Sequence, residues 1–366
     1  MAIFFFLVGM EIKHEIRHGE LADMRRAALP IVAALGGMIV PVMPYVLLNH
    51  GHDGQQGWGI PMATDIAFSL GVLGMVKGIT PELKIFLLTL AIADDICAIA
   101  VIAIFYSSSL DGGVLFAGLL LLGLIAILQR LGISQPVLYF VLGLGVWVAI
   151  LRSGIHATIA GVILGFMVPT TAPFSLQEFQ EIGSTMVTRF RKAQDEGDEK
   201  TAKNLLGSFE ALVQSTESVS ERLTRRLNDW VSFLILPLFA LANAGVTFSG
   251  EIARGLLTSR VAWGVLLGLI AGKPLGIICF SMFAVRWNVA QLPNGVSWQQ
   301  IGSVAVLAGI GFTVSIFISS LAFQTDPYLS EAKTAVLAAS VMSGVVCYLI
   351  LKSQGGAHRV TTDDPH

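Results

Sequence analysis

Apolar runs long enough to cross a lipid bilayer recur along the chain, and they constrain its fold more than any other feature. A helix needs about 20 mainly apolar residues to span ~30 Å of hydrocarbon. The run KIFLLTLAIADDICAIAVIAIF, which begins at Lys84, is one of several. Only 13% of the 366 residues are charged and the mean hydropathy is +0.74, whereas a soluble domain has about 25% charged residues. The sequence therefore predicts an all-α polytopic membrane protein.

The apolar runs also predict the domain organisation. The first stretch, MAIFFFLVGM, reaches only about 15 Å as a helix, and we interpret it as the second half of a membrane helix whose first half is not in this chain. Further spans are predicted at 27–48, 58–76, 83–106, 112–129, 135–151, 154–168, 230–248, 260–285, 299–323 and 332–351. We expect an N-terminal membrane part (1–168), a charged segment (169–229), a C-terminal membrane part (230–352) and a cytoplasmic tail (353–366).

The charged segment 169–229 has no apolar run. Its Ser175 and Glu178 match a capping box at the start of a helix. We expect one or two amphipathic helices that lie at the membrane surface or pack on the helix ends, and a regulatory module is the alternative. If the spans alternate, one side of the membrane carries 18 Lys and Arg and the other 4, or 10 and 4 without this segment. The segment and the C-terminus are therefore predicted to be cytoplasmic.

Two predicted spans contain breaks near their middle. In 58–76, Pro61 precedes ATDIAF, where Thr64 and Asp65 can cap a second half-helix. The span 299–323 contains AGIGFTVS, with two glycines that interrupt it. Such breaks can be ordinary kinks, but breaks in corresponding positions of two repeats point to a transporter site. The two repeats predicted here are the three-span groups 27–106 and 260–351.

Four ionisable residues lie deepest in the apolar runs: Asp65, Asp94, Asp95 and Lys273. Each charge at the centre of a bilayer helix costs about 2.5–3.5 kcal/mol on the lenient insertion scale. One lysine cannot neutralise three acids, so at least one carboxylate must be protonated or bound to a cation. Carboxylate oxygens are hard ligands that suit Na⁺, Li⁺ or H⁺. The surplus of acids therefore predicts the handling of cations or protons.

The two adjacent aspartates cannot do the same work. Consecutive helical residues point about 100° apart, so one of Asp94 and Asp95 can approach Lys273 while the other faces the ion path. Pro274 weakens the helix next to this lysine, and the lysine could release its proton when a cation neutralises its partner. For Asp65 two interpretations stay open, the capping of a half-helix and direct contact with the ion.

Several motifs, in order along the chain, resemble those of the NhaA-type sodium/proton antiporters. The match covers residue 1 to about 350 outside the charged segment. The motifs are FFFLVGMEIKHEI (4–16), ATDIAFSLGVL (63–73), LKIFLLTLAIADDICAI (83–99), SGIHATIAGVILG (153–165), FLILPLFALANAGV (233–246), GKPLGI (272–277) and GFTVSIFISSLAF (311–323).

The resemblance implies an inverted-repeat fold with two interrupted, crossing helices, and electrogenic exchange of cytoplasmic Na⁺ or Li⁺ for external protons. It also implies an ion site. Asp94 and Asp95 match its paired aspartates, which would bind Na⁺ or Li⁺ transiently, and Lys273 matches the lysine that pairs with the first of them. Thr64 and Asp65 match the threonine and acid at the helix crossing.

The resemblance also implies residues for the pH response. Glu11 and Glu15 match acids of the cytoplasmic funnel, and His156 matches a histidine linked to the same property. The family tends to have Glu and His residues before the span at 230, so the pH dependence of this chain is expected to differ. Its residues there are Thr224, Arg225, Arg226 and Asn228. The hairpin through which the family dimerises has no counterpart, which leaves a homodimer open.

We therefore predict a secondary active transporter, not an enzyme, in a prokaryotic plasma (inner) membrane. Its predicted partners are Na⁺, Li⁺ and H⁺ as substrates and membrane lipid, without a cofactor, and the net charge of −2 argues against nucleic acid. The alternatives are a cation-coupled solute symporter, an inactive truncated antiporter and an intramembrane aspartyl protease. Neither protease motif, YD nor GxGD, occurs in the sequence.

Overall fold

A computed structural model describes residues 1–76, 79–107, 110–133, 135–172, 175–243, 258–324 and 327–358. Every regular element in these ranges is a helix, so the prediction of an all-α chain is confirmed. The elements of the N-terminal part are α1 (Ala2–His18), η1 (Glu20–Ala22), α2 (Met24–Asn49), η2 (Asp53–Met62), α3 (Ile66–Gly74), α4 (Pro81–Phe105), α5 (Gly112–Arg130), α6 (Pro136–Arg152) and α7 (Ala157–Met167). The elements that follow are α8 (Leu176–Asp195), α9 (Glu199–Ser215), α10 (Val219–Trp230), η3 (Val231–Ile235), α11 (Leu236–Asn243), α13 (Arg260–Leu267), η4 (Gly268–Gly272), α14 (Lys273–Arg286), α15 (Trp298–Leu307), α16 (Phe312–Ala322) and α17 (Tyr328–His358).

The lengths and composition of these helices fit a membrane. Among the described residues, five continuous helices are long and apolar enough to cross it: 24–49, 81–105, 112–130, 260–286 and 328–353. The pair α15 and α16 becomes a sixth if its 45° bend is counted as one broken span. Large apolar side chains such as Phe116 and Phe140 are 61% and 71% exposed, which suits contact with lipid rather than water.

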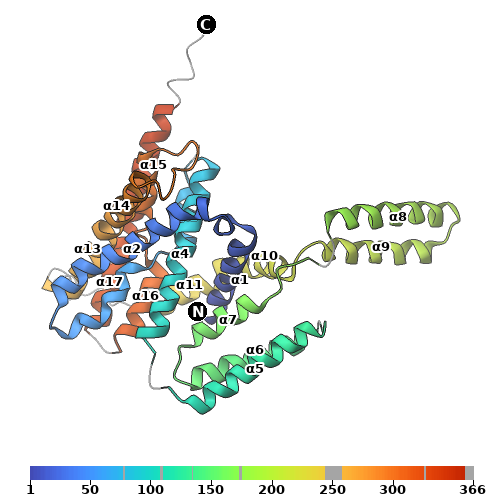
Figure 1. The fold of residues 1–366 in the computed structure, drawn as a ribbon, viewed down its shortest axis with the longest axis horizontal. Helices are drawn as coiled ribbons and strands as arrows, with labels where there is room; N and C mark the ends of the chain where they lie inside the picture. The colour runs from blue at the N-terminus through green and yellow to red at the C-terminus, as the bar shows by residue number, and fades with distance from the viewer. Residues whose placement is uncertain are drawn as a thin grey trace, which may run out of the picture.

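The closest helix packing joins α2 to α14, beside each other in Figure 1. Gly36 and Gly276 face each other here, and a Cβ placed on Gly276 would lie 2.1 Å from the carbonyl oxygen of Gly36. Small residues let membrane helices approach until their backbones touch. This contact fixes α14, and with it Lys273, against α2.

The short first helix packs on α7 by the same means. Gly161 and Gly165 form a G-x-x-x-G pattern on α7, and a Cβ at Gly165 would lie 2.4 Å from the carbonyl oxygen of Phe6. At Gly9 of α1, an added Cβ would lie 2.6 Å from the carbonyl oxygen of Val162. The backbone contact holds the charged end of α1 in a fixed place.

The prediction of one or two helices in 169–229 is wrong, since three helices form there. The predicted capping box of Ser175 and Glu178 is present at the start of α8, and a second box starts α10 at Ser218. The third helix escaped the prediction because α10 continues without a break into η3, at the edge of the next apolar run.

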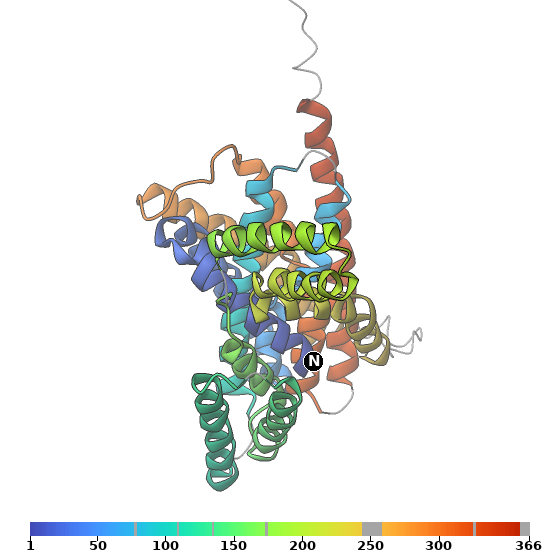
Figure 2. The ribbon, with the colours of Figure 1, turned by 90° about the vertical axis from the view of Figure 1, so that its right-hand side faces the viewer.

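Helices α8 and α9 form a hairpin that extends away from the other helices (Figures 1 and 2). Phe179 and Phe209 pack against each other inside it, with ring centroids 6.1 Å apart. The chain leaves and returns at one place, because the Ser220 N–H donates to the Pro169 carbonyl oxygen at 3.1 Å. The hairpin thus starts and ends at a closed junction, the hydrogen-bonded contact between Pro169 and Ser220.

The first half of the broken span 58–76 differs from the prediction. It is a 3₁₀ helix, η2, and not an α-helix. Its sequence DGQQGWGIPM holds three glycines and a proline, which lower the propensity for α-helix. The other predicted break is confirmed between Leu307 and Phe312. The predicted span 230–248 lies partly outside the described residues, which end at Asn243 in this region.

Candidate functional site

The two broken spans cross each other at their breaks. The Asp65 N–H donates to the Ile310 carbonyl oxygen at 2.7 Å, and the Thr64 hydroxyl reaches the Ala308 carbonyl oxygen at 3.1 Å. In the other direction, the Ser315 hydroxyl donates to the Ile60 carbonyl oxygen at 2.8 Å. Backbone groups freed by each break are thus satisfied by the other span, as irregular backbone inside a membrane requires.

Asp65 caps helices on both sides of this crossing. Its Oδ1 accepts from the Phe68 N–H at 3.1 Å and so caps α3, which was one of the two interpretations left open by the sequence. Its Oδ2 accepts from the Thr313 N–H at 3.0 Å and from the Thr313 hydroxyl at 2.5 Å. A carboxylate is favoured at helix N-termini by the dipole and by the free N–H groups. Asp65 therefore joins the start of α3 to the first turn of α16.

Next to the crossing, Asp94 on α4 pairs with Lys273 on α14. The Lys273 Nζ lies 2.8 Å from Asp94 Oδ2, and neither side chain is exposed to solvent. The same carboxylate oxygen accepts from the Thr64 hydroxyl at 2.6 Å, and Lys273 also donates to the Met62 carbonyl oxygen. A buried ion pair needs such additional hydrogen bonds to offset its desolvation.

The backbone before Lys273 is irregular. Residues Gly268–Gly272 form a π-helical segment, and Pro274 follows the lysine. A proline lacks the N–H that would bond to an earlier turn, and π-bulges are frequent at functional sites. The predicted weak point in this helix is therefore present, immediately before the lysine.

Asp95 points elsewhere from the same turn of α4 and is 1% exposed. Within the described residues, neither Asp95 Oδ2 nor Asp94 Oδ1 has a hydrogen-bond partner, although both atoms are buried. A buried carboxylate oxygen without a partner carries a large desolvation cost. The site thus has free carboxylate oxygens that a proton or a hard cation can satisfy.

No cluster of three or more His, Cys, Asp or Glu that could hold a metal ion lies in the described parts of the chain. If Asp94 and Asp95 bind Na⁺ or Li⁺ as predicted, they are the two acidic side chains that do so, without a third His, Cys, Asp or Glu among the described residues. Other oxygens available nearby are the Thr64 hydroxyl and the carbonyl oxygens at the helix breaks.

A cavity of about 330 Å³ lies at the charged end of α1. The predicted Glu11 and Glu15 line it, together with His14. Leu88 and Ile92 of α4 complete one wall, and Ile92 is two residues from Asp94. The structure thus brings the two predicted acids of the pH response close to the helix that carries the aspartates.

Although the family resemblance singled out Thr224 and Arg225, the sequence did not predict that helix α10 supplies the opposite wall of this cavity. Its contributors are Ser220, Glu221, Thr224, Arg225 and Asn228. A signal was present, because positions 221, 224, 225 and 228 share one face of a helix. It was overlooked because a charged helical face is usually exposed to water.

His156 does not line the cavity. It is the N-cap of α7, where its Nδ1 lies 3.0 Å from the Thr158 hydroxyl oxygen. Its ring packs edge-on against Phe317, with centroids 5.0 Å apart. The structure therefore separates His156 from Glu11 and Glu15, and its suggested part in the pH response stays a prediction.

Comparison with known proteins shows the family to which the chain is similar. A model of the family described as Na⁺/H⁺ antiporter 1 matches residues 1–351. A protein of Rhodopirellula baltica named Na⁺/H⁺ antiporter NhaA is 44% identical over 346 residues, which cover 94% of this chain and 77% of the relative. A protein of the same name from Koribacter versatilis is 44% identical over 96% of this chain and 77% of its own length. The Proteus mirabilis NhaA is 43% identical over 96% of this chain and 80% of its own length.

Proposed function

This chain belongs to the Na⁺/H⁺ antiporter family that its sequence matches, and from that premise we propose how its residues exchange the two ions. It is a Na⁺/H⁺ antiporter, a secondary active transporter rather than an enzyme, and a multi-pass membrane protein. The protease and symporter alternatives are dropped because the matched family consists of antiporters.

We propose that Asp95 binds the transported cation or a proton in turn. The observation that carries this proposal is that neither the buried Asp95 Oδ2 nor the buried Asp94 Oδ1 has a hydrogen-bond partner among the described residues. An unpaired charge at this depth is too costly to persist, so Asp95 takes up a proton whenever no cation is bound. Binding of one ion then excludes the other, which couples their fluxes.

Asp94 and Lys273 are the second proposed element of the exchange. A cation that enters beside Asp95 also attracts the Asp94 carboxylate. It therefore competes for this carboxylate with Lys273, whose Nζ lies 2.8 Å from Asp94 Oδ2. Lys273 then loses the partner that stabilises its charge and gives up a proton. Asp95 and Lys273 then release two protons for each cation bound. Because the charges exchanged are unequal, the exchange is electrogenic.

The path and the orientation belong to the same proposal. Cytoplasmic Na⁺ reaches the aspartates through the cavity lined by Glu11 and Glu15, and Li⁺ follows the same path. Movement of the crossing spans alternates access between the two sides. The excess of Lys and Arg supports a cytoplasmic location for the α8–α9 hairpin and the C-terminus, in a bacterial inner membrane.

Transport in everted membrane vesicles tests the site. Addition of Na⁺ should collapse an imposed pH gradient, as read by the fluorescence of a pH-sensitive dye. The substitution Asp95→Asn should abolish this response because asparagine neither titrates nor neutralises a cation. Asp111→Asn is the matched control, since this exposed aspartate only caps α5. Full activity of Asp95→Asn at wild-type expression would overturn the assignment.

A further inference from the structure

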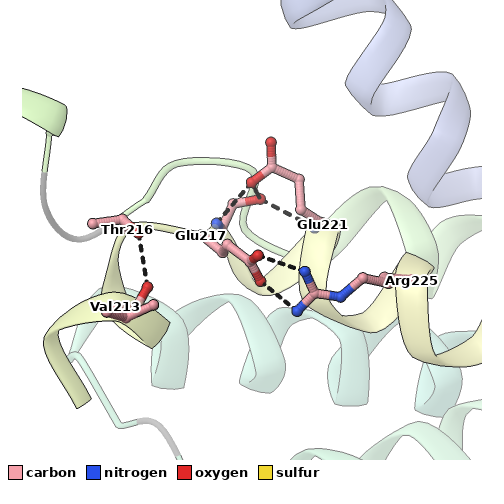
Figure 3. Close-up of polar contacts among 6 residues, drawn as sticks. Val213, Thr216, Glu217, Glu221 and Arg225 are labelled. Carbon is pink, nitrogen blue, oxygen red and sulfur yellow. Dashed lines mark hydrogen bonds and ion pairs between the residues drawn. The ribbon is translucent and has the colours of Figure 1, made fainter. Parts of the chain in front are cut away.

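Glu217, in the linker that joins α9 to α10, forms an ion pair with Arg225 of α10. Two parallel contacts connect the side chains, from Arg225 Nη1 to Glu217 Oε1 at 2.6 Å and from Nη2 to Oε2 at 2.8 Å (Figure 3). This bidentate arrangement is the favoured geometry between a guanidinium and a carboxylate. It defines where the positive charge of Arg225 lies.

The position of Glu217 is fixed on both sides. Before it, the Thr216 hydroxyl donates to the Val213 carbonyl oxygen at 2.7 Å, at the end of α9. After it, Ser218 forms the capping box of α10 with Glu221, in which the Ser218 N–H donates to Glu221 Oε2 at 2.9 Å (Figure 3). The linker therefore presents the Glu217 carboxylate at a defined place beside α10.

Arg225 lines the same cavity as Glu11, Glu15 and Glu221. Three acids and one arginine thus surround a space through which we propose that Na⁺ passes. Without Glu217, the guanidinium at this wall would carry a full positive charge that cancels part of the negative potential that concentrates cations. The paired Glu217 carboxylate neutralises that charge.

We propose that Glu217 is a positioning residue that holds and neutralises the Arg225 guanidinium at the wall of the cavity and so sets the apparent affinity for Na⁺. The inference rests on the proposed path of the cation, and it concerns uptake rather than the exchange at Asp95. Both side chains are partly exposed, 67% for Arg225 and 36% for Glu217. Exposed pairs contribute little to folding, so the effect falls on transport kinetics rather than on stability.

Kinetics in everted vesicles test this inference. Glu217→Gln should raise the apparent KM for Na⁺ by about fivefold, the effect of one unit charge at close range in water, and leave the maximal rate unchanged. Arg225→Gln in the same background should return KM to the wild-type value, because no unneutralised positive charge is then left at the wall. Added choline chloride should shrink the effect of Glu217→Gln by screening.

Glu199→Gln is the matched control. It breaks the exposed pair of Glu199 with Lys203, whose atoms lie 3.4 Å apart on α9, away from the cavity. It should not change KM. An unchanged KM in Glu217→Gln, or an equal rise in the double variant, would overturn the inference. A wrong assignment of the ion site would give a different result, namely retained transport in Asp95→Asn.

Discussion

Lys273 and Asp94 depend on each other because both are fully buried. Lys273→Met should leave the Asp94 carboxylate buried without its ion-pair partner. Removal of one partner of a buried pair lowers the free energy of unfolding by about 3–5 kcal/mol. A lower midpoint of thermal unfolding in detergent is the expected result. The double variant Asp94→Asn/Lys273→Met should recover much of the loss, since neither charge is then buried. A double variant as unstable as the single one would contradict this dependence.

Sequence reasoning reached part of this residue-scale picture. The helical offset of Asp94 and Asp95 predicts that only one of them reaches Lys273, and the structure has Asp94 in that contact. The further contacts to Thr64 and Met62 were not predictable, because they join residues 30 and 211 positions apart in the chain. Their roles in transport stay predictions.

At the scale of elements, the start of α10 depends on pH through Glu221. The Ser218 N–H and hydroxyl, and the charges of His14 and His18, hold the pKa of Glu221 below its usual range. A carboxyl whose pKa is lowered by folding stabilises the fold above its unfolded pKa, and this stabilisation is lost as the pH falls through the folded pKa.

The first turn of α10 should therefore open more often as the pH falls below the ordinary glutamate range. Hydrogen exchange of this turn, read by mass spectrometry, is the measurement, with Glu221→Gln at each pH as the reference for the intrinsic exchange rate. The difference between the two proteins should vanish at low pH. A difference that is constant with pH would contradict the prediction.

The contact between α2 and α14 gives a second element-scale prediction. Gly276→Leu should prevent the helices from closing, because even a Cβ would lie 2.1 Å from the Gly36 carbonyl oxygen. We expect loss of folded protein in fluorescence-detected size-exclusion chromatography. Gly71→Leu is the control, since an added Cβ there meets nothing within 4 Å. Equal yields of the two variants would be inconsistent with the close contact.

Element type and element number were predictable to different degrees. The breaks were visible in the sequence because Pro61, Gly309 and Gly311 interrupt apolar runs. The 3₁₀ form of η2 was not, since glycine and proline oppose an α-helix without specifying what replaces it. The separate helix α10 was missed because it continues without a break into η3, at the edge of the next apolar run.

At the scale of the whole molecule, the α8–α9 hairpin is separable from the helices around the site. Among the described elements, α8 and α9 pack extensively only on each other. Replacing residues 176–212 by a short Gly/Ser linker should leave folding and Na⁺-dependent transport intact, because Pro169 and Ser220 already meet. The linker leaves Glu217 and the bond between Thr216 and Val213 in place. Transport by the shortened protein in vesicles is the measurement, and its loss at normal expression would contradict the prediction.

The cavity is the feature of the whole molecule that sequence reasoning reached least. Glu11 and Glu15 were expected at a cytoplasmic funnel only because the family resemblance implies it. That Glu221 and Arg225 face them depends on how α10 returns from the hairpin, and no local pattern specifies this.

The closed junction at Pro169 and Ser220 also has a practical consequence for imaging. A 39.1 kDa membrane protein offers little mass outside a detergent micelle or lipid disc for the alignment of particle images. The turn between Asp195 and Glu199 lies at the far end of the hairpin (Figure 1). A rigid soluble protein grafted there would give each particle a marker of orientation, carried on two paired helices.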